Sequence, residues 1–97
     1  MNTTNEYKLI DGTFSAQEAR EILLDMINKK IQFHHLKNFS SEERFGKPVP
    51  ASLKRIKELE RDKVELLNKL EIAALGQYKL RIKASIVLGF CKQPELV

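Results

Sequence analysis

Hydrophobic residues recur at helical spacing over two long stretches of the chain, and they alternate with polar residues near its C-terminal end. Residues 16–35 gather their apolar side chains on one broad helical face. Residues 52–75 form a second helical stretch whose apolar positions alternate in steps of three and four, like a coiled-coil seam. Residues 79–90 alternate in the manner of a strand. The pattern therefore predicts a helical hairpin followed by one long strand.

Shorter signals mark where these elements begin and end. Ser15 followed by Glu18 is a capping box, which predicts a helix start at residue 16. Residues 6–10 have strand-forming composition, and Asp11-Gly12 predicts a turn directly after them. Residues 36–46 lose the clean period and predict a separate short helix that ends at Gly46.

The link between the long helices contains Pro48 and Pro50, which lack the amide hydrogen that a helix interior needs. We therefore expect the second helix to begin at Ser52. The predicted fold class is α+β: one domain over residues 1–97, with the helical hairpin and its short intervening helix packed on a small sheet of N- and C-terminal strands. Residues 1–5 and 92–97 are expected to be flexible.

Composition is that of a folded globular chain, with 42% hydrophobic and 31% charged residues. The net charge of +4 comes from the second half, because residues 47–97 carry eleven Lys/Arg against six Asp/Glu. A basic half favours anionic partners. Cys91 is the single cysteine, so an internal disulfide and a multi-cysteine zinc site are excluded, and its apolar surroundings predict a buried, inert thiol. We expect a cytoplasmic protein without a membrane span or export signal.

Signals for catalysis are weak. The chain has no GxSxG, Walker, GxGxxG or HExxH motif, and neither a cofactor nor a metal is predicted. The enzymatic alternative is a small enzyme that uses His34 together with Glu42 or Glu43. The structural interpretation, a satisfied or surface histidine, is favoured.

Basic residues cluster where the second long helix begins, although cations at a helix N-terminus oppose its dipole. Free amide groups at such an end also suit phosphate or carboxylate. This mismatch predicts a candidate anion-binding site, whose alternative is neutralisation by nearby glutamates or simple solvation. The candidate residues are Arg44, Lys47, Ser52, Lys54, Arg55 and Lys57.

The broad apolar face of residues 16–35 is wider than one packing partner needs, which either another subunit or a simple wide core face would explain, and the long strand leaves an unpaired edge. A two-stranded ribbon is marginal alone, and pairing or packing with another copy would cover it. Homo-oligomerisation is therefore predicted. The candidate interface residues are Ile56, Leu59, Leu66, Leu70, Ile82 and Ile86.

The stretch GTFSAQEAREILLDMINKKIQFHHLKNFSSEERFGKPVPASLKRIKEL resembles small uncharacterised bacterial or mobile-element proteins with an ERFG turn between two helices. The resemblance spans about residues 9–70 and implies no activity. The segment GKPVPASLKR is also similar to the basic, proline-containing loop of phage-encoded helical-hairpin proteins that sequester cyclic nucleotides as oligomers. This second resemblance carries no binding residues across.

The function predicted from these features is a non-enzymatic, homo-oligomeric binding or regulatory protein with an anion site at the basic helix start. Its partner would be an anionic ligand, a nucleotide or an acidic protein. The alternatives are a protein that binds nucleic acid or sequesters a cyclic nucleotide, and the small enzyme that uses His34.

Overall fold

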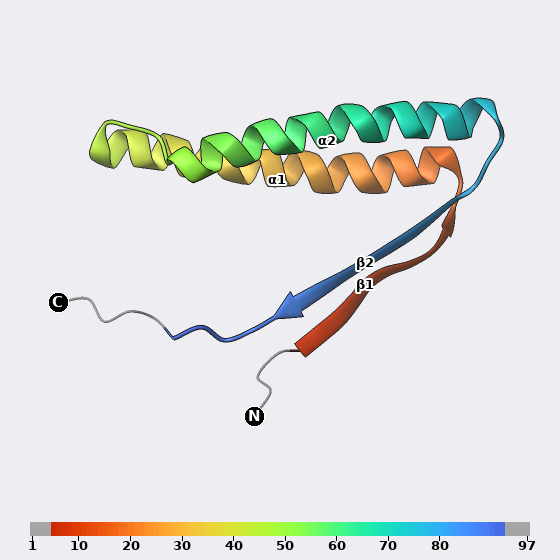
Figure 1. Cartoon of the computed structure of the whole chain (residues 1–97), viewed down its shortest axis with the longest axis horizontal. Coiled ribbons are helices and arrows are strands. Elements are labelled where there is room, and N and C mark those ends of the chain that lie inside the picture. Colours follow the sequence, from red (N-terminus) through yellow and green to blue (C-terminus); the bar gives the residue numbers. More distant parts are fainter. Residues whose placement is uncertain (1–4, 93–97) are drawn as a thin grey trace.

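The computed structural model describes residues 5–92. A strand β1 (Asn5–Phe14) is followed by two helices, α1 (Ala16–Phe45) and α2 (Pro50–Leu75), and by a second strand β2 (Leu80–Leu88). The helices form an antiparallel hairpin and the strands form a two-stranded antiparallel ribbon (Figure 1). The predicted α+β class is confirmed. The predicted flexible ends fall mainly outside the described residues, although Asn5 already belongs to β1.

The first helix is longer than predicted, because no residue between His35 and Gly46 interrupts it. The separate short helix over residues 36–46 is therefore wrong: these residues are the last three turns of α1. The predicted start at Ala16 and the predicted helix stop at Gly46 are confirmed, whereas the predicted end of the first helix near His35 is wrong. Ser15 and Glu18 form the reciprocal capping box, and Gly46 adopts the left-handed conformation (φ 75°) that closes the helix.

The second helix begins two residues earlier than predicted, at Pro50. Proline is compatible with the first helical position because the amide hydrogen it lacks has no partner in the helix there. Val49 precedes it as the N-cap and supplies no side-chain capping bond. Ser52 consequently lies inside the first turn instead of capping it.

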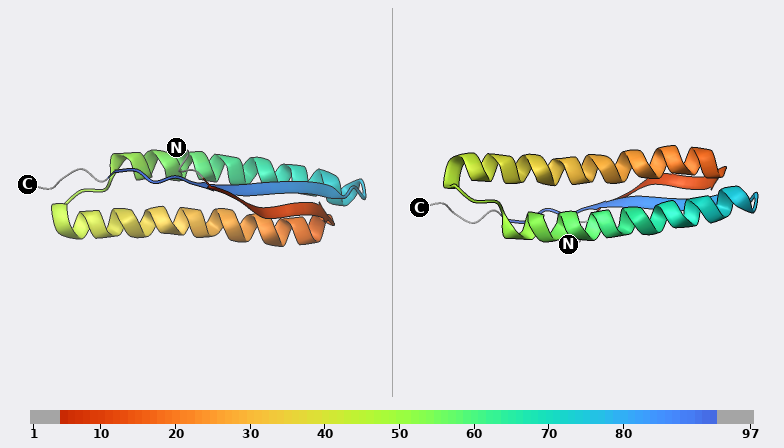
Figure 2. Two further views of the ribbon diagram at one scale, coloured as in Figure 1. Left: turned by 90° about the horizontal axis from the view of Figure 1, so that it is seen from below. Right: turned by 90° about the horizontal axis from the view of Figure 1, so that it is seen from above.

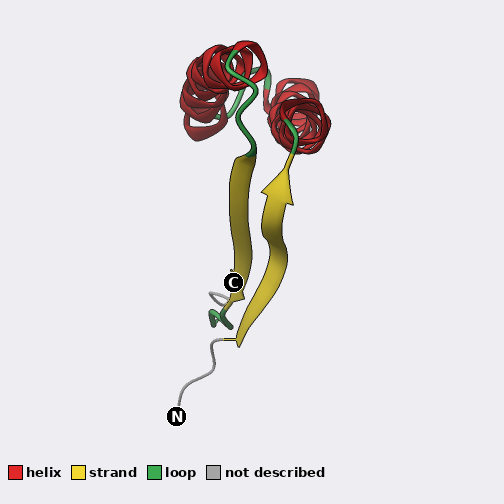
Figure 3. Ribbon diagram, turned by 90° about the vertical axis from the view of Figure 1, so that its right-hand side faces the viewer, coloured by secondary structure: helices red, strands yellow, loops and turns green. Residues whose placement is uncertain are grey.

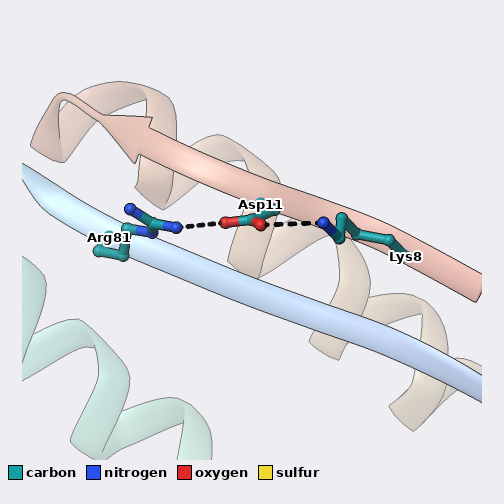
Figure 4. Close-up of polar contacts among 3 residues, drawn as sticks. All are labelled: Lys8, Asp11 and Arg81. Carbon is teal, nitrogen blue, oxygen red and sulfur yellow. Dashed lines mark hydrogen bonds and ion pairs between the residues drawn. The ribbon is translucent and has the colours of Figure 1, made fainter.

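The predicted turn at Asp11-Gly12 is also wrong, since β1 continues through it to Phe14. Asp11 accepts a hydrogen bond from Arg81 of β2 at 2.6 Å, and its other carboxylate oxygen lies 3.4 Å from the Lys8 ammonium (Figure 4). Gly12 pairs with Ile82, and the register shifts at Leu9, which forms a bulge. Cross-strand contacts thus override a local turn signal.

The ribbon has one apolar and one polar face, because residues paired across an antiparallel ribbon point to the same side. The predicted alternation in β2 is confirmed by this pairing. The apolar face consists mainly of Tyr7, Ile10, Phe14, Leu80, Ile82, Ala84, Ile86 and Leu88. The other face carries Glu6, Lys8, Asp11, Thr13, Arg81, Lys83, Ser85 and Val87.

Within residues 5–92, the buried contact between ribbon and hairpin lies near the end where they join. There, Ala19 of α1, Leu70 of α2 and Ile82 of β2 form a small buried cluster, bordered by Phe14 and Leu80 among others. Beyond this base the ribbon runs below the two helices (Figure 2) and swings away from them (Figures 1 and 3). The predicted packing of the hairpin on the sheet therefore holds at the base alone.

This geometry gives an extended molecule. The Cα radius of gyration is 17.5 Å, whereas a compact domain of this length has about 13 Å. Ile27 of α1 and Ile56, Leu59 and Ala73 of α2 are also buried. Cys91 is exposed, which corrects the predicted buried thiol. Within residues 5–92, neither helix holds an apolar segment long enough to cross a membrane.

Candidate functional site

The tip of the hairpin brings together the end of α1, the proline-containing link and the start of α2. The Asn38 side chain is buried there, and its Oδ1 accepts a hydrogen bond from the Val49 amide at 3.0 Å. The Ser41 hydroxyl donates to the Lys47 carbonyl at 2.8 Å. These two bonds hold a link in which Pro48 and Pro50 have no amide hydrogen to offer. Side chains of α1 therefore fix where α2 begins.

One turn further along, His34 and Ser52 join the two helices. His34 Nδ1 lies 3.0 Å from Ser52 Oγ, and Ser52 is only 2% exposed. His34 Nε2 is buried and has no hydrogen-bond partner among the described residues. Desolvation, followed by the nearby charges of Lys30, Lys37 and Arg55, lowers the pKa of His34. The neutral imidazole is therefore the form that this position favours.

A serine–histidine hydrogen bond can activate a nucleophile, but this one is oriented into the hairpin. A substrate cannot approach Ser52 Oγ, because the serine is buried between the helices. The acid that the enzymatic alternative requires is also not in place. Glu42 and Glu43 are exposed, and eight helical residues place Glu42 about 12 Å beyond His34 along α1. The pair that we observe acts as a link between the helices.

The structure separates the six candidate anion residues into two groups. Arg44, Lys47, Lys54 and Lys57 are exposed at the tip end of the hairpin. Lys54 and Lys57 are three residues apart and share one side of α2. Ser52 is turned inward to His34, and Arg55 Nη1 donates to Glu58 Oε2 at 3.0 Å. The expected neutralisation by a glutamate thus applies to Arg55, and Ser52 is not available to a ligand.

The start of α2 offers fewer free donors than the sequence suggested. Val49 N–H is already bonded to Asn38, Pro50 has no N–H, and Leu53 N–H donates to the Val49 carbonyl at 3.1 Å. Among the described residues, no group of three or more His, Cys, Asp or Glu side chains could hold a metal ion. An anion at the tip would therefore depend mainly on the exposed basic side chains.

The candidate interface residues also fall into two groups. Most of them are buried within the single chain: Ile56, Leu59 and Leu70 between the helices, and Ile82 at the ribbon base. Leu66 is half-buried on α2, and Ile86 is exposed on the apolar ribbon face. The seam therefore holds the hairpin together, whereas the outer ribbon leaves apolar surface uncovered.

Sequence reasoning missed Asn38, whose role depends on a link residue eleven positions away. It also missed the apolar side of α1 that faces the ribbon, where Ile22 and Met26 line a hollow together with Leu9 and Ile10. The unusually wide apolar stripe of α1 was the available signal for this surface.

Comparison with protein-family models, with curated proteins and with solved structures finds no match to this chain.

Proposed function

We propose that the chain is a non-enzymatic binding or regulatory protein that works as a homo-oligomer. The observation that carries this proposal is the amount of surface that the single chain leaves exposed. Its accessible surface is 8362 Å², whereas a compact monomer of 11.2 kDa exposes about 5,700 Å².

The residues outside the described range do not account for this excess. The nine residues outside 5–92 can contribute at most about 1,500 Å², the area that nine residues expose in an unfolded chain. After that area is removed, the remaining surface still exceeds that of a compact monomer of the remaining mass by about 1,600 Å². A standard protein interface buries about 800 Å² per partner, so the excess is large enough for a stable assembly.

The chemical nature of the exposed residues supports the same proposal. Large apolar side chains are exposed on each of the four elements. Large exposed apolar patches on a folded protein mark interaction surfaces. The exposed side chains include Tyr7, Leu9, Met26, Phe33, Leu36, Val64, Ile72 and Ile86.

Sedimentation-velocity ultracentrifugation of the full chain at micromolar concentration tests the oligomer. The expected result is a mass of at least two chains, with circular dichroism showing the helical content of the hairpin. A mass of one chain throughout this range would overturn the proposal.

A second proposed property, anion binding at the hairpin tip, is supported by the exposed Arg44, Lys47, Lys54 and Lys57. Nucleic acid and cyclic nucleotides are the alternative ligands in this class. Fluorescence anisotropy with a labelled single-stranded oligonucleotide, and calorimetry with a cyclic dinucleotide, distinguish them. We expect binding that weakens as salt rises and that is lost when Arg44, Lys47, Lys54 and Lys57 are all changed to Ala. Unchanged binding by this variant would exclude the tip as the site.

A further inference from the structure

The outer half of the ribbon and the facing side of α1 form an open wedge, which we define by Tyr7, Leu9, Ile22, Met26 and Ile86. Leu9 and Ile10 of β1 line one hollow in it together with Ile22 and Met26 of α1. Tyr7 pairs with Ile86 further out, on the ribbon face that carries the buried Ile82. The face that is buried at the base thus continues uncovered along the ribbon, as the divergence in Figures 1 and 3 allows.

The two ribbon faces are chemically unequal, and this inequality indicates which one is covered. On the polar face, Asp11 is already paired within the chain, with Arg81 and with Lys8 (Figure 4). The wedge side has no such charges on the ribbon. A two-stranded ribbon is marginally stable alone and needs packing on its apolar face. In this chain, its own helices supply that packing only at the base.

From these observations we propose that the apolar lining of the wedge packs against the same lining in a second copy of this chain. The apolar ribbon faces of both copies are then buried in a two-fold assembly. This inference rests on the proposed function and specifies its interface.

A second copy fits the wedge better than another class of partner does. An isologous contact brings the same surface to both sides, so the two apolar ribbon faces, which carry no charged residue, meet each other. The excess surface of about 1,600 Å² per chain is sufficient for such a contact. Nucleic acid does not fit, because the floor is apolar and the α1 rim carries Glu21 and Asp25. If the ribbon always needs packing on its apolar face, its partner must be available wherever the protein is made. A second copy of the same chain meets this requirement.

The primary test compares two neighbouring positions of β2 that lie on opposite ribbon faces. Ile86 is 43% exposed on the wedge side, and Ser85 is exposed on the polar side. Ile86→Asp is expected to weaken assembly by roughly 30-fold or more in ultracentrifugation, as loss of a central interface residue does. Ser85→Asp, which adds the same charge to the other face, is expected to keep the mass of the wild-type protein.

A second measurement covers the case in which Ile86→Asp does not fold. With Cys91→Ser as the background, Ile86→Cys and Ser85→Cys each present one thiol, and their alkylation rates by iodoacetamide are compared in the assembled protein. Cysteine at position 86 is expected to react about tenfold more slowly than at position 85, because access controls thiol reactivity.

The outcomes separate the two proposals. A monomeric wild-type protein overturns both. An oligomeric wild-type protein whose mass survives Ile86→Asp, and in which the thiols at positions 85 and 86 react equally fast, overturns the wedge interface and leaves the proposed oligomer intact. Loss of assembly in Ile86→Asp alone, or selective protection at position 86, supports the wedge.

Discussion

His34 Nδ1 lies 3.0 Å from Ser52 Oγ and connects the two long helices one turn below their tip. The imidazole is desolvated there and surrounded by Lys30, Lys37 and Arg55, which together keep its pKa below the ordinary value. The folded protein therefore binds fewer protons at this site than the unfolded chain. It follows that the contribution of His34 to stability is complete above the unfolded pKa of about 6.5 and is lost as the pH falls below it.

The first prediction is that mild acid destabilises the hairpin through His34. The melting temperature of the wild-type protein is expected to fall between about pH 7.5 and about pH 5.5, and His34→Gln should reduce that fall because glutamine does not titrate. His35→Gln is the matched control, since His35 is the exposed neighbour. An equal pH dependence in wild type and His34→Gln would contradict the assignment.

The second prediction concerns the buried Asn38. Asn38→Ala leaves the Val49 amide without its partner, and an unsatisfied buried donor costs about 1–3 kcal/mol of unfolding free energy. Ser40→Ala, at an exposed position of the same helix, should stay within about 0.5 kcal/mol of wild type. Urea denaturation measures both variants. Equal effects would show that Asn38 does not hold the link.

The third prediction concerns the capping box at the start of α1. Ser15→Ala should cost about 1 kcal/mol at neutral pH, whereas Gln17→Ala in the same turn should be nearly neutral. Hydrogen bonds from the Ser15 backbone and side chain lower the pKa of Glu18, so its contribution is present above the ordinary carboxylate pKa and is lost as the pH falls through the lowered value. The cost of Ser15→Ala should therefore shrink in acid. A cost that is independent of pH would argue against the coupling.

The fourth prediction concerns the junction of hairpin and ribbon. Leu70→Ala should cost about 2–5 kcal/mol, because Leu70 packs on Ala19 and Ile82 in the buried cluster. It should also reduce hydrogen-exchange protection of the ribbon amides, since the cluster is where the ribbon is attached. Leu75→Ala is the control, with a side chain that is 79% exposed. If Leu70→Ala leaves ribbon protection unchanged, the ribbon does not depend on this cluster.

Local signals were sufficient for the helical hairpin, the two caps of α1 and the apolar face of β2, because each depends on residues a few positions apart. The continuation of β1 through Asp11-Gly12 could not be predicted in this way. Asp11 is held by Arg81, which is 70 positions away, and a strong local turn signal gave way to that pairing. Similarly, residues 36–46 stay in α1 because nothing breaks the helix before Gly46.

The candidate site was predictable only in part. Lys54, Arg55 and Lys57 lie in the first turns of α2, as their charge pattern in the sequence suggested, whereas Arg44 belongs to α1 and Lys47 to the link. The inward orientation of Ser52 and the role of Asn38 depend on contacts between α1 and the segment that follows it. The wedge depends on the angle between ribbon and hairpin, which no local pattern encodes.

The antiparallel pairing of β1 with β2 favours one order of folding. Phe14 pairs with Leu80, and the whole helical hairpin lies between these two residues in the chain. Closing that loop first, without the helices, would carry a large entropic cost. We therefore expect the hairpin to form before the ribbon, and the ribbon then to zip outward from Phe14 and Leu80 toward the Asn5–Leu88 pair. The pair nearest the helices is the first to close, and the pair farthest from them is the first to fray.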